Sequence, residues 1–256
     1  MQKISLFIFI AIFIFFNQYL FAQDNKELDI KSKAILENNC LKCHKNSTGK
    51  PEIDKAYLLW DRSSHSTFGV TCDSCHNGDI TQESKTKAHI GILEMDKPKN
   101  YIYYLKMDGN CGVCHESEFK DFESSTHYRF LKKGNGPSCI SCHDPKSGHI
   151  LDPNEILASC YVCHNKELKG YENVPDLAAY VIELTKIADT MINWAEQFLE
   201  IAKKEGRKTN WAKAKLFNAK REVLRAKYWH TFDLAANKDH AQKAIQLSIE
   251  AKGSLN

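Results

Sequence analysis

The apolar residues of this 256-residue chain follow a helical spacing only in its last third. After a start signal of Pro175 and Asp176, they recur at alternating steps of four and three, which places them on one face of an α-helix. This stripe consists of Leu177, Val181, Leu184, Ala188, Met191, Ala195, Phe198 and Ala202. The segment Lys203–Gly206 ends the helix, because glycine readily adopts the backbone conformation found just after helices.

Two further helices are predicted after this one. The first runs from near Asn210 to about Ala236. Its apolar face consists of Ala212, Leu216, Ala219, Val223, Ala226 and then His230. The residues Asn237–Asp239 break it, and a shorter helix follows from about His240 to Ala251. Since the connections are short, we expect two long antiparallel helices with the third packed beside them, in a C-terminal region of residues 173–256.

Residues 23–172 show little periodicity and many turn signals, such as Asn77-Gly78 and Ser147-Gly148. Their apolar residues are too few for a protein-only core of this size. We therefore expect a mainly α protein with little or no sheet. A loop-rich domain packed around cofactors precedes the long helices.

One motif, Cys-Xaa-Xaa-Cys-His, occurs five times in this domain. Its copies are Cys40, Cys43 and His44; Cys72, Cys75 and His76; Cys111, Cys114 and His115; Cys139, Cys142 and His143; and Cys160, Cys163 and His164. In this signature of c-type haem attachment, two thiols add to the vinyl groups of one porphyrin and the adjacent His ligates the iron. The motifs use all ten Cys, so five covalently bound haem c groups are predicted. Zinc sites and redox-active disulfides are the alternatives, and neither needs a His after every second Cys.

Four of the six remaining His recur at matched places in an approximate two-haem repeat. The copies span residues 40–90 and 111–150, and the fifth motif follows them. His65 and His127 each precede the second motif of their copy, whereas His89 and His149 each follow it. This matched placement predicts that all four are distal iron ligands.

The fifth distal ligand has to come from the C-terminal region, which offers His230 and His240. A His at a helix start can point directly at a cofactor, so we prefer His240, which the pattern places at the start of the last helix. His230, on the apolar face of the preceding helix, is the alternative.

Residues 1–22 are predicted to form a secretory signal peptide. They contain a single charge at Lys3, an apolar run over Ile4–Phe16 and the small residue Ala22 before the expected cleavage site. The mature chain is then periplasmic or otherwise exported, with an uncleaved N-terminal membrane anchor as the alternative. No later segment is long and apolar enough to span a membrane, so no span is expected after cleavage.

The net charge of +3 reflects 35 basic and 32 acidic residues. This near balance gives no reason to expect a nucleic-acid partner. The excess of Lys in the C-terminal region is typical of a solvated helix face.

The mature chain resembles the multihaem superfamily of pentahaem nitrite reductases, octahaem hydroxylamine oxidoreductases and related tetrahaem electron carriers. The resemblance rests on the order Ser-Xaa-His, motif and second His at residues 63–89 and 124–149, and on His240 before the last helix. It implies a stack of haems, redox partner proteins and homo-oligomers formed through the C-terminal helices. The nitrite reductases replace one motif His by Lys at the catalytic haem, whereas all five motifs here end in His.

The sequence leaves three functions open. If every iron has two His ligands, the chain carries electrons along a row of haems, because a six-coordinate iron has no open position for a substrate. If one iron is five-coordinate, it acts on a small nitrogen or sulfur compound. Groups for proton transfer or charge stabilisation would then be Tyr101, Tyr103, Tyr104, Lys106 or Arg129. The third is a subunit that docks on a larger enzyme through exposed Trp194, Trp211 and Trp229.

Overall fold

The structure, a computed structural model, describes residues 35–45, 49–93, 101–144 and 153–255. Helices and no strand occur within these ranges, which confirms the mainly α prediction for the part of the chain described. The described residues form two compact units, one of residues 35–93 and one of residues 101–144 and 153–255. The predicted signal peptide at residues 1–22 and the candidate ligand His149 lie outside the described residues.

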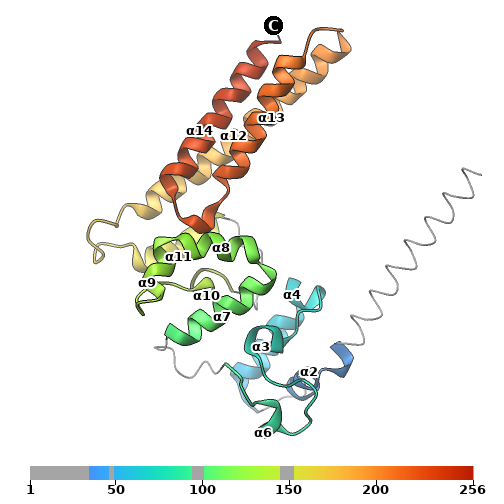
Figure 1. Cartoon of the computed structure of the whole chain (residues 1–256), viewed down its shortest axis with the longest axis vertical. Helices are drawn as coiled ribbons and strands as arrows, with labels where there is room; N and C mark the ends of the chain where they lie inside the picture. Colours follow the sequence, from blue (N-terminus) through green and yellow to red (C-terminus); the bar gives the residue numbers. More distant parts are fainter. Residues whose placement is uncertain (1–34, 46–48, 94–100, 145–152, 256) are drawn as a thin grey trace, which may run out of the picture. The chain divides into compact units, whose positions relative to one another are not determined.

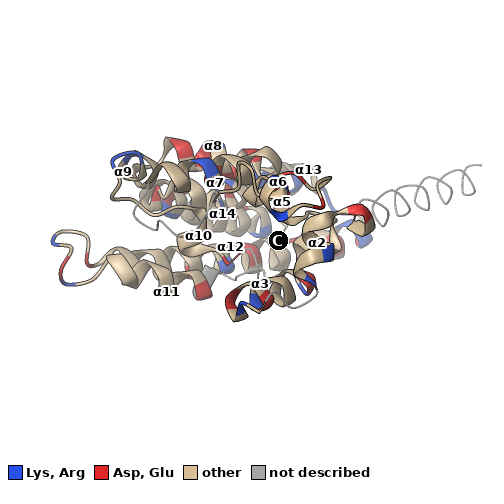
Figure 2. Ribbon diagram, turned by 90° about the horizontal axis from the view of Figure 1, so that it is seen from below, with Lys and Arg blue, Asp and Glu red and all other residues tan. Residues whose placement is uncertain are grey.

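The first unit consists of short helices, two of which begin with a side-chain cap. They are α2 (Asn39–His44), α3 (Pro51–Asp61), α4 (Ser64–Thr67), α5 (Cys72–His76) and α6 (Lys85–Ala88). Asn38 accepts a hydrogen bond from the Leu41 N–H at the start of α2, and Ser63 does the same for the first turn of α4. The helix α3 has no fully buried residue and carries charges of both signs (Figure 2). The buried residues among those described in this unit are Leu41 and the two capping residues, Asn38 and Ser63.

The second unit begins with helices that surround the third, fourth and fifth motifs. They are α7 (Tyr101–Cys114), α8 (Glu116–Ser124), α9 (Thr126–Leu131), α10 (Cys139–Cys142) and α11 (Pro153–Cys163). Phe122 and Leu131 are buried between them. Gly136 lets the chain pass directly against α9, because a Cβ at this position would lie 2.2 Å from the Leu131 nitrogen.

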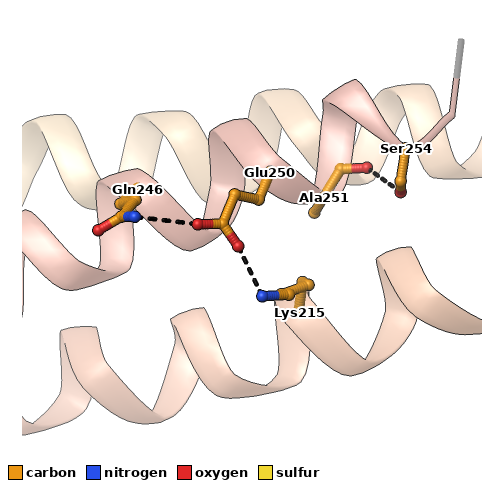
Figure 3. A network of polar contacts seen from close by, with 5 residues as sticks. All are labelled: Lys215, Gln246, Glu250, Ala251 and Ser254. Atoms are coloured by element: carbon orange, nitrogen blue, oxygen red, sulfur yellow. Dashed lines mark hydrogen bonds and ion pairs between the residues drawn. The ribbon is translucent and has the colours of Figure 1, made fainter.

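The same unit continues into three long helices that lie side by side (Figure 1). They are α12 (Val174–Lys204), α13 (Asn210–Ala226) and α14 (Leu234–Gly253), with the short 3₁₀ helix η1 (Trp229–Thr231) between the last two. Many of the core residues are alanines, which let helix backbones approach closely. The core consists of Ala188, Ile192, Ala195, Leu199, Ala202, Ala212, Leu216, Ala219, Val223, Ala244, Leu247, Ala251 and Leu255. The Lys215 ammonium and the Glu250 carboxylate, 2.6 Å apart, join α13 to α14 at the rim of this core (Figure 3).

The predicted first long helix is confirmed, but the centre of its buried face is shifted. Ala188, Ala195 and Ala202 are fully buried as expected. Leu177 is 42% exposed, and Ile192 and Leu199 are buried in place of the predicted neighbours Met191 and Phe198. The helix has two partners, α13 and α14, so its buried face is centred between them and not on the largest apolar residues.

The predicted limits of the last two helices are wrong. The helix α13 ends at Ala226, and His230 lies on η1 and not on a long helix. The sequence pattern predicts a helix break at Asn237, but in the structure Asn237 lies within α14. Its side chain is 3% exposed. Its Nδ2 donates to the carbonyl oxygens of Ala226 at 2.9 Å and Tyr228 at 3.3 Å. Asn237 therefore satisfies backbone groups that the end of α13 leaves without helical partners.

Candidate haem sites

Each of the five motifs lies on a helix, and this arrangement suits haem attachment. The first, second and fourth lie on α2, α5 and α10, and the third and fifth form the C-terminal ends of α7 and α11. Residues three apart in a helix share a face, so both thiols of a motif lie on the same side. All ten thiols are free, and each is at least partly exposed. The residues present therefore fit the formation of two thioether bonds per motif.

Three motif His rings each lie close to the ring of a His from outside the motifs. The ring centres of His44 and His89 are 6.2 Å apart, with an angle of 31° between the planes. The rings of His164 and His127 are 5.9 Å apart at 57°, and those of His143 and His230 are 6.0 Å apart at 25°. Each pair thus combines one predicted proximal ligand with one predicted distal candidate.

This spacing is the one expected for two imidazoles on opposite sides of a metal ion. An imidazole nitrogen lies about 2 Å from a metal it binds, and the ring centre lies about 1 Å farther away, so two opposite rings are about 6 Å apart. The Nδ1 atom of His127 is also buried without a hydrogen-bond partner among the described residues. A buried imidazole nitrogen is rarely left in this state in a protein. The three pairs therefore fit bis-His iron.

Burial favours the neutral form, which binds metals, in four of these rings. Burial lowers the pKa of His44, and the neighbouring His89 lowers it further. Burial likewise lowers the pKa of His127, His143 and His230. The Nδ1 atom of His164 lies 3.1 Å from the Tyr171 carbonyl oxygen. Donation of the Nδ1 proton to this oxygen leaves Nε2 as the ligand atom, as is common for metal-binding His.

The motif helices that are neighbours within each unit are α2 and α5 in the first, and α7 with α10 and α10 with α11 in the second. In the first unit, burial raises the pKa of Cys72 to about 12, with a further contribution from Cys40 of the preceding motif. In the second, a hydrogen bond with Cys111 raises the pKa of Cys139. Burial raises the pKa of Cys142 to about 11, and Cys160 and Cys163 of the fifth motif add to this effect. The attachment points thus follow the order first–second in one unit and third–fourth–fifth in the other.

A comparison with known protein families matches residues 17–77 to the family described as Cytochrome c554 and c-prime. The match covers the first two haem motifs. The chain is a c-type cytochrome. Comparison with curated proteins and with solved structures finds no significant match. As a c-type cytochrome the protein holds covalently bound haem c, transfers electrons and exchanges them with redox partners. Within the residues described, none of the helices is long and apolar enough to cross a membrane.

The preferred fifth ligand, His240, occupies a different environment in the cytochrome. It lies in the second turn of α14, which begins at Leu234, so the expectation that it starts a helix is wrong. Its Nδ1 atom lies 2.6 Å from a carboxylate oxygen of Glu222 on α13, and Glu222 also pairs with Arg225. The structure instead brings the alternative, His230, to a motif His.

Two motif His and one distal candidate complete the described set. His76 and His115 end the second and third motifs, and His65 lies on α4, where its carbonyl oxygen accepts a hydrogen bond from the Val70 N–H at 2.8 Å. Their coordination stays a prediction.

The residues considered for substrate chemistry and docking lie in ordinary structural settings. Tyr103 is buried and its ring contacts that of Tyr104 with centres 5.3 Å apart, while the Arg129 guanidinium donates to the Thr126 hydroxyl at 2.7 Å. Tyr101, Lys106, Trp194 and Trp211 are exposed, and Trp229 is half-buried. The exposed Trp194 lies on the outer side of α12.

Proposed function

We propose that the cytochrome is an exported pentahaem electron carrier in which every iron has two axial His ligands. The observation that carries this proposal is the set of three pairs formed by one motif His and one non-motif His at 5.9–6.2 Å. Bis-His coordination fills both axial positions, so such an iron exchanges electrons but has no place for a substrate.

The remaining ligands can be assigned by elimination. His240 is engaged by Glu222, which leaves five non-motif His for five motifs. Three are in the pairs, and the other two, His65 and His149, would complete the irons of His76 and His115. Residues 23–172 would then form the haem domain with its two-haem repeat, and η1 of the C-terminal region would add one ligand to it.

The neighbouring attachment points suggest how electrons move inside each unit. The helices of the first and second motifs are in contact, as are those of the third and fourth and of the fourth and fifth. Haems bound there would lie near one another, which favours rapid transfer between them. The potential of each haem would depend on its burial, its axial ligands and nearby charges.

The oxidised cytochrome is expected to contain only low-spin haem. The visible and electron paramagnetic resonance spectra of the protein with five haems bound should lack a high-spin component and should not change when cyanide or nitrite is added. A high-spin signal that disappears on addition of either anion would contradict the proposal. It would instead support the alternative of a five-coordinate haem that acts on a small nitrogen or sulfur compound.

We also propose that two copies of the chain pair through α12. Four large apolar residues on its exposed side are spaced seven apart: Tyr180, Ile187, Trp194 and Ile201. A seven-residue repeat keeps one stripe facing a partner helix. The stripe is about 30 Å long, at about 1.5 Å per residue. In an antiparallel pair Ile187 would face the partner's Trp194, and Tyr180 would face the partner's Ile201, so the stripe complements itself about a two-fold axis.

Charges placed in this stripe should separate the two copies. The double variant I187E/W194E is expected to reduce the mass measured by light scattering after size-exclusion chromatography from that of a dimer to that of a monomer. The matched control is Phe217→Glu on α13, which is 64% exposed and lies outside the stripe. A wild-type protein that is monomeric at all accessible concentrations would disprove the pairing.

A further inference from the structure

A buried polar side chain lies just before the first motif of each two-haem module. Asn38, two residues before Cys40, is 1% exposed. Its Oδ1 accepts from the Leu41 N–H at 3.3 Å and so caps α2. Its Nδ2 donates to Oδ1 of Asp73 at 3.1 Å. Asp73 is the second residue of α5, the helix of the second motif, so Asn38 connects the two motif helices of the first unit.

Asp108 has the corresponding place in the second unit. It lies on α7, three residues before Cys111, and its side chain is fully buried. Its Oδ1 accepts a hydrogen bond from the backbone N–H of Cys139 at 3.1 Å, 31 residues away. Cys139 is the first residue of α10, the helix of the fourth motif. Asp108 therefore connects the third and fourth motifs as Asn38 connects the first and second.

The two contacts differ in their local chemistry. Asp73 also accepts from the Thr71 hydroxyl at 2.5 Å, whereas Oδ2 of Asp108 is buried without a hydrogen-bond partner among the described residues. Burial raises the pKa of Asp108 to about 6, and hydrogen bonding to Cys139 opposes this rise. A carboxyl group can accept through Oδ1 in either protonation state. The same connection is thus made by an amide in one module and by a carboxyl group in the other.

We propose that Asn38 and Asp108 are positioning residues that set the separation of the two haems within each module. Each haem is bonded covalently to its motif helix, so a contact that fixes two such helices also fixes the attachment points of their haems. The motif helices joined by these contacts also lie against each other, α2 against α5 and α7 against α10. The inference rests on the proposed multihaem function and not on which His binds which iron.

Asp108 is tested by comparing Asp108→Ala with Asp108→Asn in the haem-loaded protein. Asn retains an oxygen that can accept from the Cys139 N–H, and Ala does not. We expect hydrogen exchange at the Cys139 amide to be roughly tenfold faster or more in the Ala variant, because a buried hydrogen bond to a carboxylate is lost. The magnetic interaction between neighbouring haems in the paramagnetic resonance spectrum should also change in the Ala variant and be retained in the Asn variant. An Ala variant with unchanged haem interaction would overturn the assignment for this module.

The contact between Asn38 and Asp73 can be tested independently by exchanging the two side chains. Asn38→Asp alone places two carboxylates in contact and should alter the interaction between the first two haems. Combining it with Asp73→Asn restores one donor and one acceptor, and should recover the wild-type spectrum. A double variant that is no closer to wild type than N38D would overturn the assignment. In both tests the haems should stay low-spin, so a failure of the positioning role is distinguishable from a failure of bis-His coordination.

Discussion

Replacing His230 with Ala is expected to convert one haem of the oxidised cytochrome from low-spin to high-spin. The ring of His230 lies 6.0 Å from that of His143, so its removal would leave the iron at the fourth motif with one axial ligand. The loss of the strong-field imidazole should be seen as a new high-spin signal in the paramagnetic resonance spectrum. Added imidazole should remove this signal by occupying the open position.

His240→Ala is the matched control for this experiment. His240 is also a C-terminal His, but its contact is with Glu222, at 2.6 Å. The variant should keep all haems low-spin and should change stability by no more than about 1 kcal/mol, because the contact with Glu222 is partly exposed. The opposite result, a high-spin haem in H240A and none in H230A, would restore the preference drawn from the sequence.

Replacing Asn237 with Ala should destabilise the C-terminal region by about 2 kcal/mol, because the carbonyl oxygens of Ala226 and Tyr228 would lose their side-chain donor. Urea unfolding followed by circular dichroism at helical wavelengths measures this change. The effect should extend to the haem, since Tyr228 leads directly into η1, which carries His230. We expect the spectrum of N237A to contain a minor high-spin fraction that increases on warming. This increase should begin at a lower temperature than in the wild type.

Asn218→Ala provides the comparison for Asn237. Asn218 lies on the exposed side of α13, so its replacement removes the same kind of amide group at a solvent-exposed position. Its unfolding free energy should stay within about 0.5 kcal/mol of the wild type. Equal destabilisation by the two substitutions would show that Asn237 has no special role at the end of α13.

The sequence predicted the first long helix well because helical periodicity depends on local spacing. This helix begins at Val174 as expected. The end of α13 was not predictable in this way, because it depends on Asn237 reaching back to Ala226 from the next helix. Asn looks like a helix break in a sequence, but as a buried donor at a helix end it stabilises the structure.

The same limit applies to the distal ligands. Spacing identified His89 and His127 as candidates, and the structure places both beside motif His. Spacing did not indicate that His127, which precedes the fourth motif, lies beside His164 of the fifth. The choice between His230 and His240 depended on where α14 begins, and its start at Leu234 moves His240 away from the helix terminus. An Asp at 233 that caps the helix through the Ala236 N–H was the available signal.

The position of His230 on η1 has a consequence for biosynthesis. The Cys residues proposed to bind the fourth haem are synthesised well before His230, which would complete its iron, and η1 is connected to α13 on one side and to α14 on the other. During this interval the haem would be attached but open on one side, and would be reactive toward small ligands. A chain that stops before Tyr228 would keep this state permanently. Completion of the C-terminal helices would therefore mark the point at which a reactive precursor becomes a closed electron carrier.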